Sequence, residues 1–341
     1  MFGPFGLADS LRLYRLQHRG VSLDPVKSLT QPRQPLAQAW LALMSQHAMG
    51  QPAFVLYDPH YGEAFLQVEY RPLQAAADIS YMAPALTENQ RAANAWAALL
   101  EGTSVEMAER GIQRLFASLP EGGPEVEPFF QAGFAPYAGE QVFRLDRPAS
   151  LPADDLEGLI RAQRLEDLPA LQRLSAAVIP QRVRQAEGGI WLAPDKGSNY
   201  RRYVVPGEQG DEMAGMLTIA SGGSGHWMRV LVHPGVRHLA KSLITWGLAH
   251  LAAQPARPVI VSVRTYEGGI APALEEIGFE LEGERVLLVK HTAAWVKSAV
   301  QELVPALTGG ARPVPPTYRM TGEPECPAGG FRASQMIERR S

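Results

Sequence analysis

The chain has 341 residues, enough for two domains of ordinary size, and its 46% hydrophobic and 20% charged content is typical of a globular protein. Its 32 basic residues against 35 acidic ones give a formal net charge of -3, which argues against a protein whose main task is to bind a nucleic-acid backbone. The single cysteine, Cys326, excludes an intramolecular disulfide framework and any metal site built from several cysteines.

The first half of the chain predicts a mixture of helices and strands from its apolar periodicity and its turn residues. In chain order we expect a helix at 36–47, strands at 53–57, 63–70 and 77–82, a helix at 88–101, a strand at 111–117, a short helix at 124–132 and a closing strand at 140–145.

The second half predicts a similar succession of elements. In chain order we expect a strand at 158–162, a helix at 166–178, strands at 201–205, 212–220 and 227–232, a helix at 237–253, a strand at 258–264, a short helix at 270–277 and a strand or hairpin at 279–290. Residues 305–330 contain 11 Pro or Gly in 26 positions, so an extended or disordered tail is expected at 306–341.

The sequence favours a cytoplasmic protein without a membrane segment. No basic segment followed by an apolar run is present near Met1, so no signal peptide is predicted. The most apolar helix-like stretch, residues 239–253, contains Lys241 and His250 and is too short to cross a bilayer. We expect no metal, no nucleic-acid partner and no membrane partner.

Two copies of a short motif divide the chain. Residues 129–134 read Phe-Phe-Gln-Ala-Gly-Phe, residues 274–279 read Leu-Glu-Glu-Ile-Gly-Phe, and in both cases Gly-Glu and an apolar strand follow. Each glycine is expected to end a helix in the left-handed conformation, and each Phe to enter the core. Gly133 and Gly278 lie 145 residues apart, which is the length of a whole domain. We therefore predict two duplicated α+β domains at 1–150 and 151–305, followed by the tail.

A strand-to-helix turn in the second half is the segment best suited to bind a ligand. A predicted strand ends at His233-Pro234, and a predicted helix begins near Arg237. Such a turn directs unpaired backbone N–H groups and the positive end of the helix dipole at one point, which makes an anion site.

This turn resembles the acyl-CoA-binding motif of the GNAT superfamily of N-acetyltransferases, in which Val232, Pro234 and Arg237 match the family pattern. Gly278-Phe279 resembles the closing motif of the family. The resemblance extends over about 158–291 and more faintly over about 10–146. It implies two GNAT-like domains in tandem, each of three α/β/α layers around a mixed, mostly antiparallel sheet, with a degenerate first copy that binds no ligand.

The resemblance also implies how acetyl-CoA, or another acyl-CoA, would bind. The strand Val230, Leu231 and Val232 would hydrogen-bond the pantetheine arm through its backbone, with an N–H near Leu231 stabilising the oxyanion. The pyrophosphate would lie on the backbone of Arg237, His238, Leu239, Ala240, Lys241 and Ser242. His238, Ala240 and Ser242 stand where the family usually has glycine.

The catalytic candidates are Tyr266, His233 and Glu212. The family's frequent acid, a Tyr, is Leu274 here, so Tyr266 at the end of the preceding strand is a substitute. His233 can act as a base because His titrates near neutral pH, and Glu212 opens a strand that would face the acceptor groove. Each of the three also has a purely structural alternative. Tyr266 can be an aromatic residue at the end of a strand, His233 a histidine in a loop, and Glu212 an exposed residue at the start of a strand.

We therefore expect an acyl-CoA-dependent N-acyltransferase that acts from its C-terminal domain on a small-molecule or peptide amine, as a monomer or homodimer. The alternatives are a non-catalytic GNAT-fold module that binds a ligand or protein, and a structural protein in which both grooves are closed. A V-shaped gap between the strands that end near Val232 and begin near Val259 would favour CoA binding, and a closed sheet would oppose it.

Overall fold

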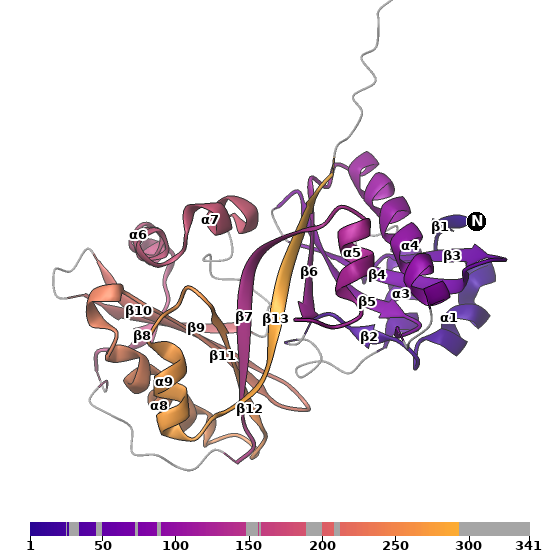
Figure 1. Ribbon diagram of the computed structural model, residues 1–341. Helices are drawn as coiled ribbons and strands as arrows, with labels where there is room; N and C mark the ends of the chain where they lie inside the picture. The colour runs from indigo at the N-terminus through magenta and orange to yellow at the C-terminus, as the bar shows by residue number, and fades with distance from the viewer. Residues whose placement is uncertain are drawn as a thin grey trace, which may run out of the picture. The chain divides into compact units, whose positions relative to one another are not determined.

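The computed structural model has α/β architecture, with a mixed and mostly antiparallel sheet and helices on its faces (Figure 1). It describes residues 1–24, 26, 34–45, 50–71, 74–86, 90–147, 156, 158–188, 200–207 and 212–292. These residues all belong to one unit, Met1–Trp295. The predicted tail therefore lies outside the described residues. No helix within these ranges is long and apolar enough to cross a membrane.

The N-terminal half contains the predicted helices and strands and several that the sequence did not predict. In chain order they are β1 (Phe2–Pro4), η1 (Leu7–Asp9), α1 (Ser10–Leu16), β2 (Val21–Ser22), α3 (Pro35–Met44), β3 (Ala53–Asp58), β4 (Gly62–Tyr70), β5 (Ala76–Ala83), α4 (Gln90–Glu109), β6 (Arg114–Pro120), α5 (Val126–Gln131) and β7 (Ala135–Leu145).

The C-terminal half follows the prediction closely, except that η2, α7 and η4 were not expected and the strand predicted at 158–162 is only the two residues of β8. Of the two possibilities for 279–290, a strand or a hairpin, the structure has a single long strand. In chain order the elements are β8 (Arg161–Ala162), η2 (Leu165–Asp167), α6 (Leu168–Val178), α7 (Gln181–Glu187), β9 (Tyr200–Pro206), β10 (Met213–Ser221), β11 (His226–Val232), η4 (Pro234–Val236), α8 (Leu239–Leu251), β12 (Val259–Arg264), α9 (Ile270–Ile277) and β13 (Glu280–His291).

Helix α4 continues well past residue 101, where the sequence predicted its end. The predicted end lies just before Gly102, and glycine is a poor helix former. The structure gives this glycine a packing role instead: a Cβ atom there would lie only 2.8 Å from the ring of Phe2 on β1. Gly102 thus permits the close approach of β1, and α4 runs through it.

The two Gly-Phe motifs end their helices in the same way. Gly133 and Gly278 have φ values of +82° and +102°, in the left-handed region. The N–H of Phe134 donates to the carbonyl of Phe129 at 3.0 Å, and the N–H of Phe279 donates to that of Leu274 at 3.0 Å. Both are the longer hydrogen bond of a Schellman motif. The expected helix ends are confirmed, and the duplication is visible in the backbone.

A second repeated feature escaped the sequence analysis. In each half a short first strand is followed by a 3-10 helix that leads into an α-helix, namely η1 with α1 and η2 with α6. Asp9 accepts a hydrogen bond from the N–H of Gly6 at 3.1 Å, and Asp167 accepts one from the N–H of Arg164 at 2.7 Å. A carboxylate caps the first turn in both halves.

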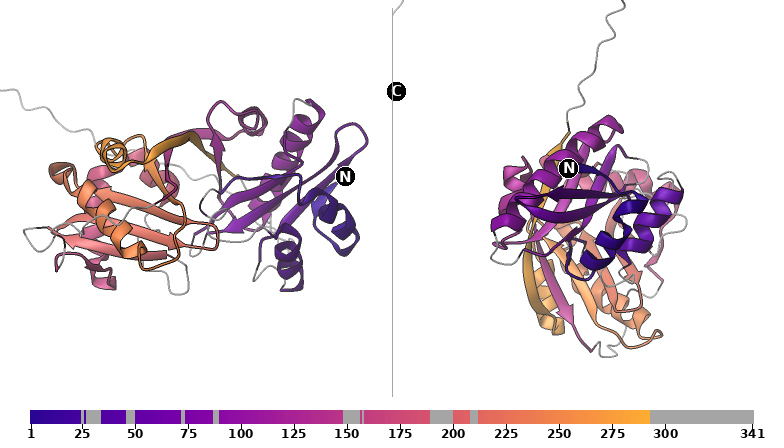
Figure 2. Two further views of the ribbon diagram at one scale, coloured as in Figure 1. Left: turned by 90° about the horizontal axis from the view of Figure 1, so that it is seen from below. Right: turned by 90° about the vertical axis from the view of Figure 1, so that its right-hand side faces the viewer.

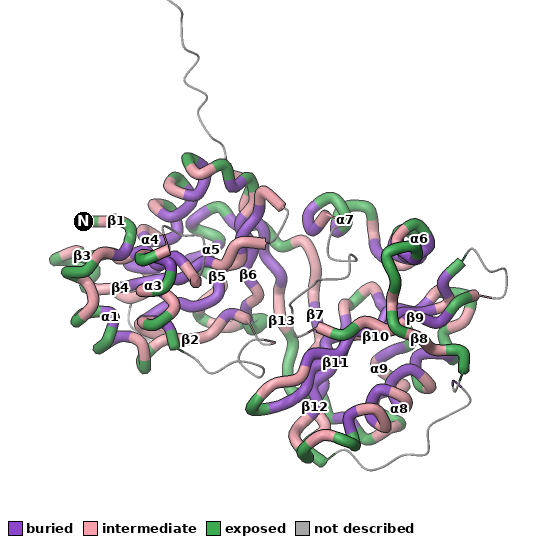
Figure 3. The backbone as a smooth tube through the Cα atoms, turned by 180° about the vertical axis from the view of Figure 1, so that it is seen from behind, coloured by how far each residue is buried: buried purple, intermediate pink, exposed green. Residues whose placement is uncertain are grey.

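Alternate side chains of a strand point to opposite faces of the sheet, and helices lie against both faces in each half (Figure 2). On β4, Leu66 packs in the core under α4 and α5, whereas Phe65 packs with α1 and α3. On β11, Val230 packs under α8 and α9, whereas Leu231 packs with α6 and α7. Figure 3 shows the corresponding mixture of buried and exposed residues along α6 and α7.

The two halves exchange their closing strands. The strand order is β1-β3-β4-β5-β6-β13-β7-β12-β11-β10-β9-β8, with β2 beside β5. Strand β7 therefore pairs with β12 of the C-terminal half, and β13 pairs with β6 of the N-terminal half; β7 and β13 run side by side in Figure 1. Phe143 accordingly belongs to the core under α8, and Leu288 to the core under α4. The sequence suggested two separate sheets, and the boundary at 150 stays a prediction.

Acid is expected to destabilise the fold through His250 on α8. Its ring stacks on Trp246 with centroids 5.0 Å apart, and its Nε2 lies 2.9 Å from the hydroxyl of Tyr203. Burial, assisted by the charge of Arg201, lowers the pKa of His250. As the pH falls, the imidazole of His250 is therefore protonated in the unfolded chain before it is protonated in the folded protein. The free energy of unfolding should accordingly decrease below about pH 6.5.

Urea unfolding at pH 7.5 and 5.5 measures this effect. The loss of stability between the two pH values should be smaller in His250→Gln than in the wild type. His18→Gln, at an exposed histidine, is the control and should keep the wild-type loss. An equal loss in all three proteins would show that His250 does not contribute.

Candidate functional site

The turn between β11 and α8 has the expected strand-to-helix form. Strand β11 ends at Val232, η4 follows, and α8 begins at Leu239. His233 has an extended backbone, and its Nδ1 accepts a hydrogen bond from the N–H of Gly235 at 3.2 Å. In the first turn of α8 the N–H of Ala240 donates to the carbonyl of Arg237 at 3.1 Å, the other N–H groups have no acceptor within the helix, and Arg237 and His238 lie exposed beside them. The turn has the features of an anion site.

Strands β11 and β12 diverge beyond a short stretch of parallel pairing. They pair only from His226 to Met228 against residues 259–261. The N–H of His226 donates toward β12, to Pro258, whereas the N–H of His233 donates toward β10, to Ala214. Because successive N–H groups of a strand point to opposite edges, the N–H groups of Val230 and Val232 face the gap. That of Leu231 faces β10, so the N–H groups near Leu231 that face the gap are those of its two neighbours, and the oxyanion role stays a prediction.

The opposite wall of the gap is closed by the side chain of Glu267. Its Oε2 accepts a hydrogen bond from the N–H of Arg264 at 2.9 Å, and its own N–H donates to the carbonyl of Arg264 at 2.8 Å. Its Oε1 accepts a hydrogen bond from Nη2 of Arg229 at 3.0 Å. The backbone N–H at the end of β12 is thereby bonded within the connection itself, whereas the gap-facing edge of β11 beyond Met228 pairs with no other described strand.

A cavity of about 50 Å3 lies at the mouth of the gap. It brings together four residues that the sequence singled out, Val232, Arg237, Ala240 and Tyr266. The remaining lining residues come from the end of α6, from η4 and from the connection between β12 and α9, and they are Val178, Pro234, Glu267, Gly268 and Ile270. The cavity is therefore bordered by helices from both faces of the sheet.

Tyr266 lines this cavity. Its hydroxyl is buried, and no hydrogen-bond partner for it is present among the described residues. Burial raises the pKa of Tyr266, and the neighbouring carboxylates of Glu267 and Glu187 add to this effect while Arg229 and Arg264 oppose it. The hydroxyl therefore stays protonated at neutral pH.

The side chain of Arg237, at the mouth of the cavity, lies beside two glycines. A Cβ atom at Gly269 would lie 3.4 Å from Cδ of Arg237, and one at Gly268 would lie 3.9 Å from its Nη1. Gly269 has a φ of +92°, which other residues rarely adopt. The Arg237 side chain thus lies along this glycine pair, and none of the described carboxylates forms an ion pair with it.

The other predicted site residues do not line the cavity. Lys241 pairs with Glu276 of α9 at 2.8 Å, while Ser242, His238 and Leu239 lie along the first turn of α8. Glu212 is exposed at the turn between β9 and β10. His233 adjoins Val232, but its Nδ1 is engaged by Gly235. Neither candidate base reaches the cavity, and the roles of these residues stay predictions.

The equivalent gap in the N-terminal half is filled by the chain itself. Strands β5 and β6 also pair only at residues 76–78 and 114–116. Beyond that stretch, β2 pairs with the free edge of β5, with Val21 opposite Met82, and the N–H of Leu23 donates to the carbonyl of Ser80 at 2.9 Å. Arg285 of β13 donates to the carbonyl of Leu23 at 3.3 Å. A ligand would find this edge occupied.

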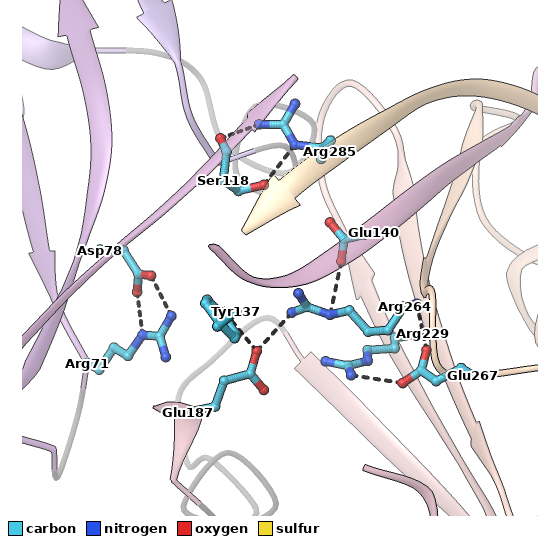
Figure 4. A network of polar contacts seen from close by, with 10 residues as sticks. All are labelled: Arg71, Asp78, Ser118, Tyr137, Glu140, Glu187, Arg229, Arg264, Glu267 and Arg285. Carbon is cyan, nitrogen blue, oxygen red and sulfur yellow. Dashed lines mark hydrogen bonds and ion pairs between the residues drawn. The ribbon is translucent and has the colours of Figure 1, made fainter. Parts of the chain in front are cut away.

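A network of buried charges on the α7 side of the sheet was not anticipated (Figure 4). Glu187 accepts hydrogen bonds from the hydroxyl of Tyr137 at 3.0 Å and from Arg264 at 3.2 Å, and Arg264 also pairs with Glu140 at 3.4 Å. Burial opposes ionisation of Glu187, but the surrounding arginines, Arg264 foremost, outweigh it and lower its pKa. The available signal in the sequence was an arginine at the end of the apolar run 259–263.

No family model and no curated protein matches the sequence. Among solved structures, a GCN5-related N-acetyltransferase from Sphaerobacter thermophilus matches with a TM-score of 0.52 at 14% identity, over 86% of this chain and 96% of that chain. A tandem GNAT protein from the clavulanic acid biosynthesis pathway is similar with a TM-score of 0.48 at 15% identity, over 86% of this chain and 99% of that one. The first likeness shows the GNAT fold, and its coverage extends over both halves.

Proposed function

We propose that this chain, which has the GNAT fold, is an acyl-CoA-dependent N-acyltransferase whose active site is the gap between β11 and β12. One observation carries the proposal. The gap of the C-terminal half combines a free strand edge, a cavity and the N-terminus of a helix, whereas the equivalent gap in the other half is occupied by β2.

Binding of the donor follows from these features. The pantetheine arm would extend β11 as an added strand, with its amide groups on the backbone of Val230 and Val232. The pyrophosphate would lie against the first turn of α8, from Arg237 to Ser242, where helix N–H groups and the Arg237 guanidinium attract negative charge. The acyl thioester would then enter the cavity beside Tyr266.

The reaction would proceed by direct transfer. The nitrogen of a neutral amine attacks the thioester carbonyl, and a backbone N–H of β11 stabilises the oxyanion. The carbon–sulfur bond then breaks, and Tyr266 gives its proton to the departing thiolate. A base removes the proton of the amine; His233, next to Val232, is our first candidate and Glu212 the second. The acceptor is a small-molecule or peptide amine.

Calorimetry with acetyl-CoA and a thiol-release assay across a panel of amines test this function. We expect saturable binding, and release of free CoA with at least one amine class. The absence of binding at millimolar acetyl-CoA, by protein shown to be folded, would refute the proposal.

A non-catalytic CoA-binding module is the second candidate function. The observation in its favour is that neither His233 nor Glu212 lines the cavity. Binding of acetyl-CoA without thiol release for any amine would select this alternative.

Reversal of the charge at Arg237 should weaken donor binding. Arg237→Glu places a carboxylate beside the pyrophosphate position, and we expect the Kd for acetyl-CoA to rise about 10- to 100-fold, as for loss of a charge-assisted contact. The matched control is Arg15→Glu, the same change on the exposed face of α1. It should leave the Kd unchanged, and an equal Kd in both variants would remove Arg237 from the binding site.

A further inference from the structure

The carboxylate of Glu267 lies inside the gap between β11 and β12. The N–H of Arg264 points toward β11, because the neighbouring N–H of Thr265 donates the other way, to Gly139 on β7 at 3.1 Å. It is this N–H that donates to Glu267 Oε2. The second oxygen reaches Arg229, one residue beyond the last pairing of β11 with β12 (Figure 4). The Glu267–Arg229 pair therefore spans the gap at its inner end.

This ion pair is a rigid wall. The side chain of Glu267 is 1% exposed and that of Arg229 is 13% exposed. An apolar group that pushed the two apart would leave charges buried without compensation, which is strongly unfavourable. Both oxygens of Glu267 are held, one by a backbone group, so the carboxylate cannot swing aside without losing a hydrogen bond.

The space in front of the wall is small. Glu267 lines the cavity together with Val232 and Tyr266, and the volume of the cavity is about 50 Å3. A single water molecule already needs about 10–15 Å3 of such a volume, so only a few heavy atoms fit.

We propose that the Glu267–Arg229 pair is a specificity-determining element that limits the donor to acyl groups of no more than about three carbons. The inference rests on the proposed function, since it assumes that the thioester enters this cavity from the β11 edge. It assigns Glu267 and Arg229 a role in excluding long acyl chains; neither residue takes part in the proton transfers.

A series of acetyl-, propionyl-, butyryl- and hexanoyl-CoA tests the inference by calorimetry and thiol release. In an apolar acyl pocket each added methylene would tighten binding about fourfold. Here we expect butyryl- and hexanoyl-CoA to bind no more tightly than propionyl-CoA. For hexanoyl-CoA we expect an affinity or kcat/KM at least about tenfold below that of acetyl-CoA, because a methylene group that does not fit its pocket costs about tenfold or more.

The double variant Arg229→Met with Glu267→Gln removes both charges and keeps an oxygen for the N–H of Arg264. It should raise the ratio of hexanoyl- to acetyl-CoA binding at least about tenfold. Removal of either charge alone would leave the other charge buried without a partner and impair folding. The matched control is Arg71→Met with Asp78→Asn, a second ion pair with an N–O distance of 2.6 Å that does not line the cavity. It should keep the wild-type ratio.

The outcomes separate the two proposals. If acetyl-CoA binds and hexanoyl-CoA binds as well or better, the acyl limit is wrong and the donor site stands. If the double variant and its control shift the ratio equally, the wall is not Glu267–Arg229. If no acyl-CoA binds to the folded wild type, the proposed function fails and this inference fails with it. Binding without thiol release still decides the inference, because the ratio is measured by calorimetry.

Discussion

Residues 151–305, expressed without the N-terminal half, are expected not to fold as a stable monomer. Strand β13 has two neighbours, β6 and β7, and both come from the first 145 residues. The fragment also lacks Phe143, which is 1% exposed in the core under α8. Loss of such a side chain costs about 3–5 kcal/mol, a large share of the about 5–15 kcal/mol that stabilises a typical domain.

Circular dichroism and size-exclusion chromatography measure the result, with residues 1–305 as the control that keeps both closing strands. The fragment should show no cooperative thermal transition, or a dimer in which two copies exchange β13, with a midpoint that depends on concentration. A monomer that melts at the temperature of the control would mean that β13 can take the place of β7 beside β12. The half would then be an independent domain.

Tyr266→Phe is expected to lower kcat about 100-fold or more, because general acid catalysis contributes about 10²- to 10⁴-fold. The Kd for acetyl-CoA should stay unchanged, since the ring still lines the cavity. Tyr137→Phe is the control: it removes another buried hydroxyl, one that donates to Glu187, and should leave kcat unchanged. An equal loss of kcat in both variants would point to a structural effect.

The pH dependence of the wild type provides an independent test of the same residue. Burial raises the pKa of Tyr266 above the ordinary value of about 10, so the acid stays protonated across the working range. The kcat profile should therefore rise as the base loses its proton and show no decline below pH 10. A decline between pH 7 and 9 would assign the acid to another group.

Much of the candidate site could be predicted because it depends on local sequence. A strand that ends at Val232, a proline and a helix start at Leu239 are encoded by neighbouring residues, and so is the glycine that ends α9. What could not be predicted is the direction of side chains from different elements. Lys241 pairs with Glu276 on another helix, and Glu267 folds back on Arg264 and Arg229. These contacts depend on how the elements pack.

The sequence by itself determined most of the longer helices and strands, the duplicated motif and the strand-to-helix turn, because periodicity, glycine conformation and helix termination act within a few residues. Only the tertiary structure decided which strands pair. The closing strands β7 and β13 have similar apolar patterns, so local sequence does not indicate which of them lies beside β12; in the structure Phe143 of β7 packs in the core under α8 and Leu288 of β13 in the core under α4. Likewise, the short strand β2 has no recognisable sequence pattern, yet it pairs with β5 and fills the gap of the N-terminal half. Among the described residues, only the gap of the C-terminal half therefore keeps an unpaired strand edge.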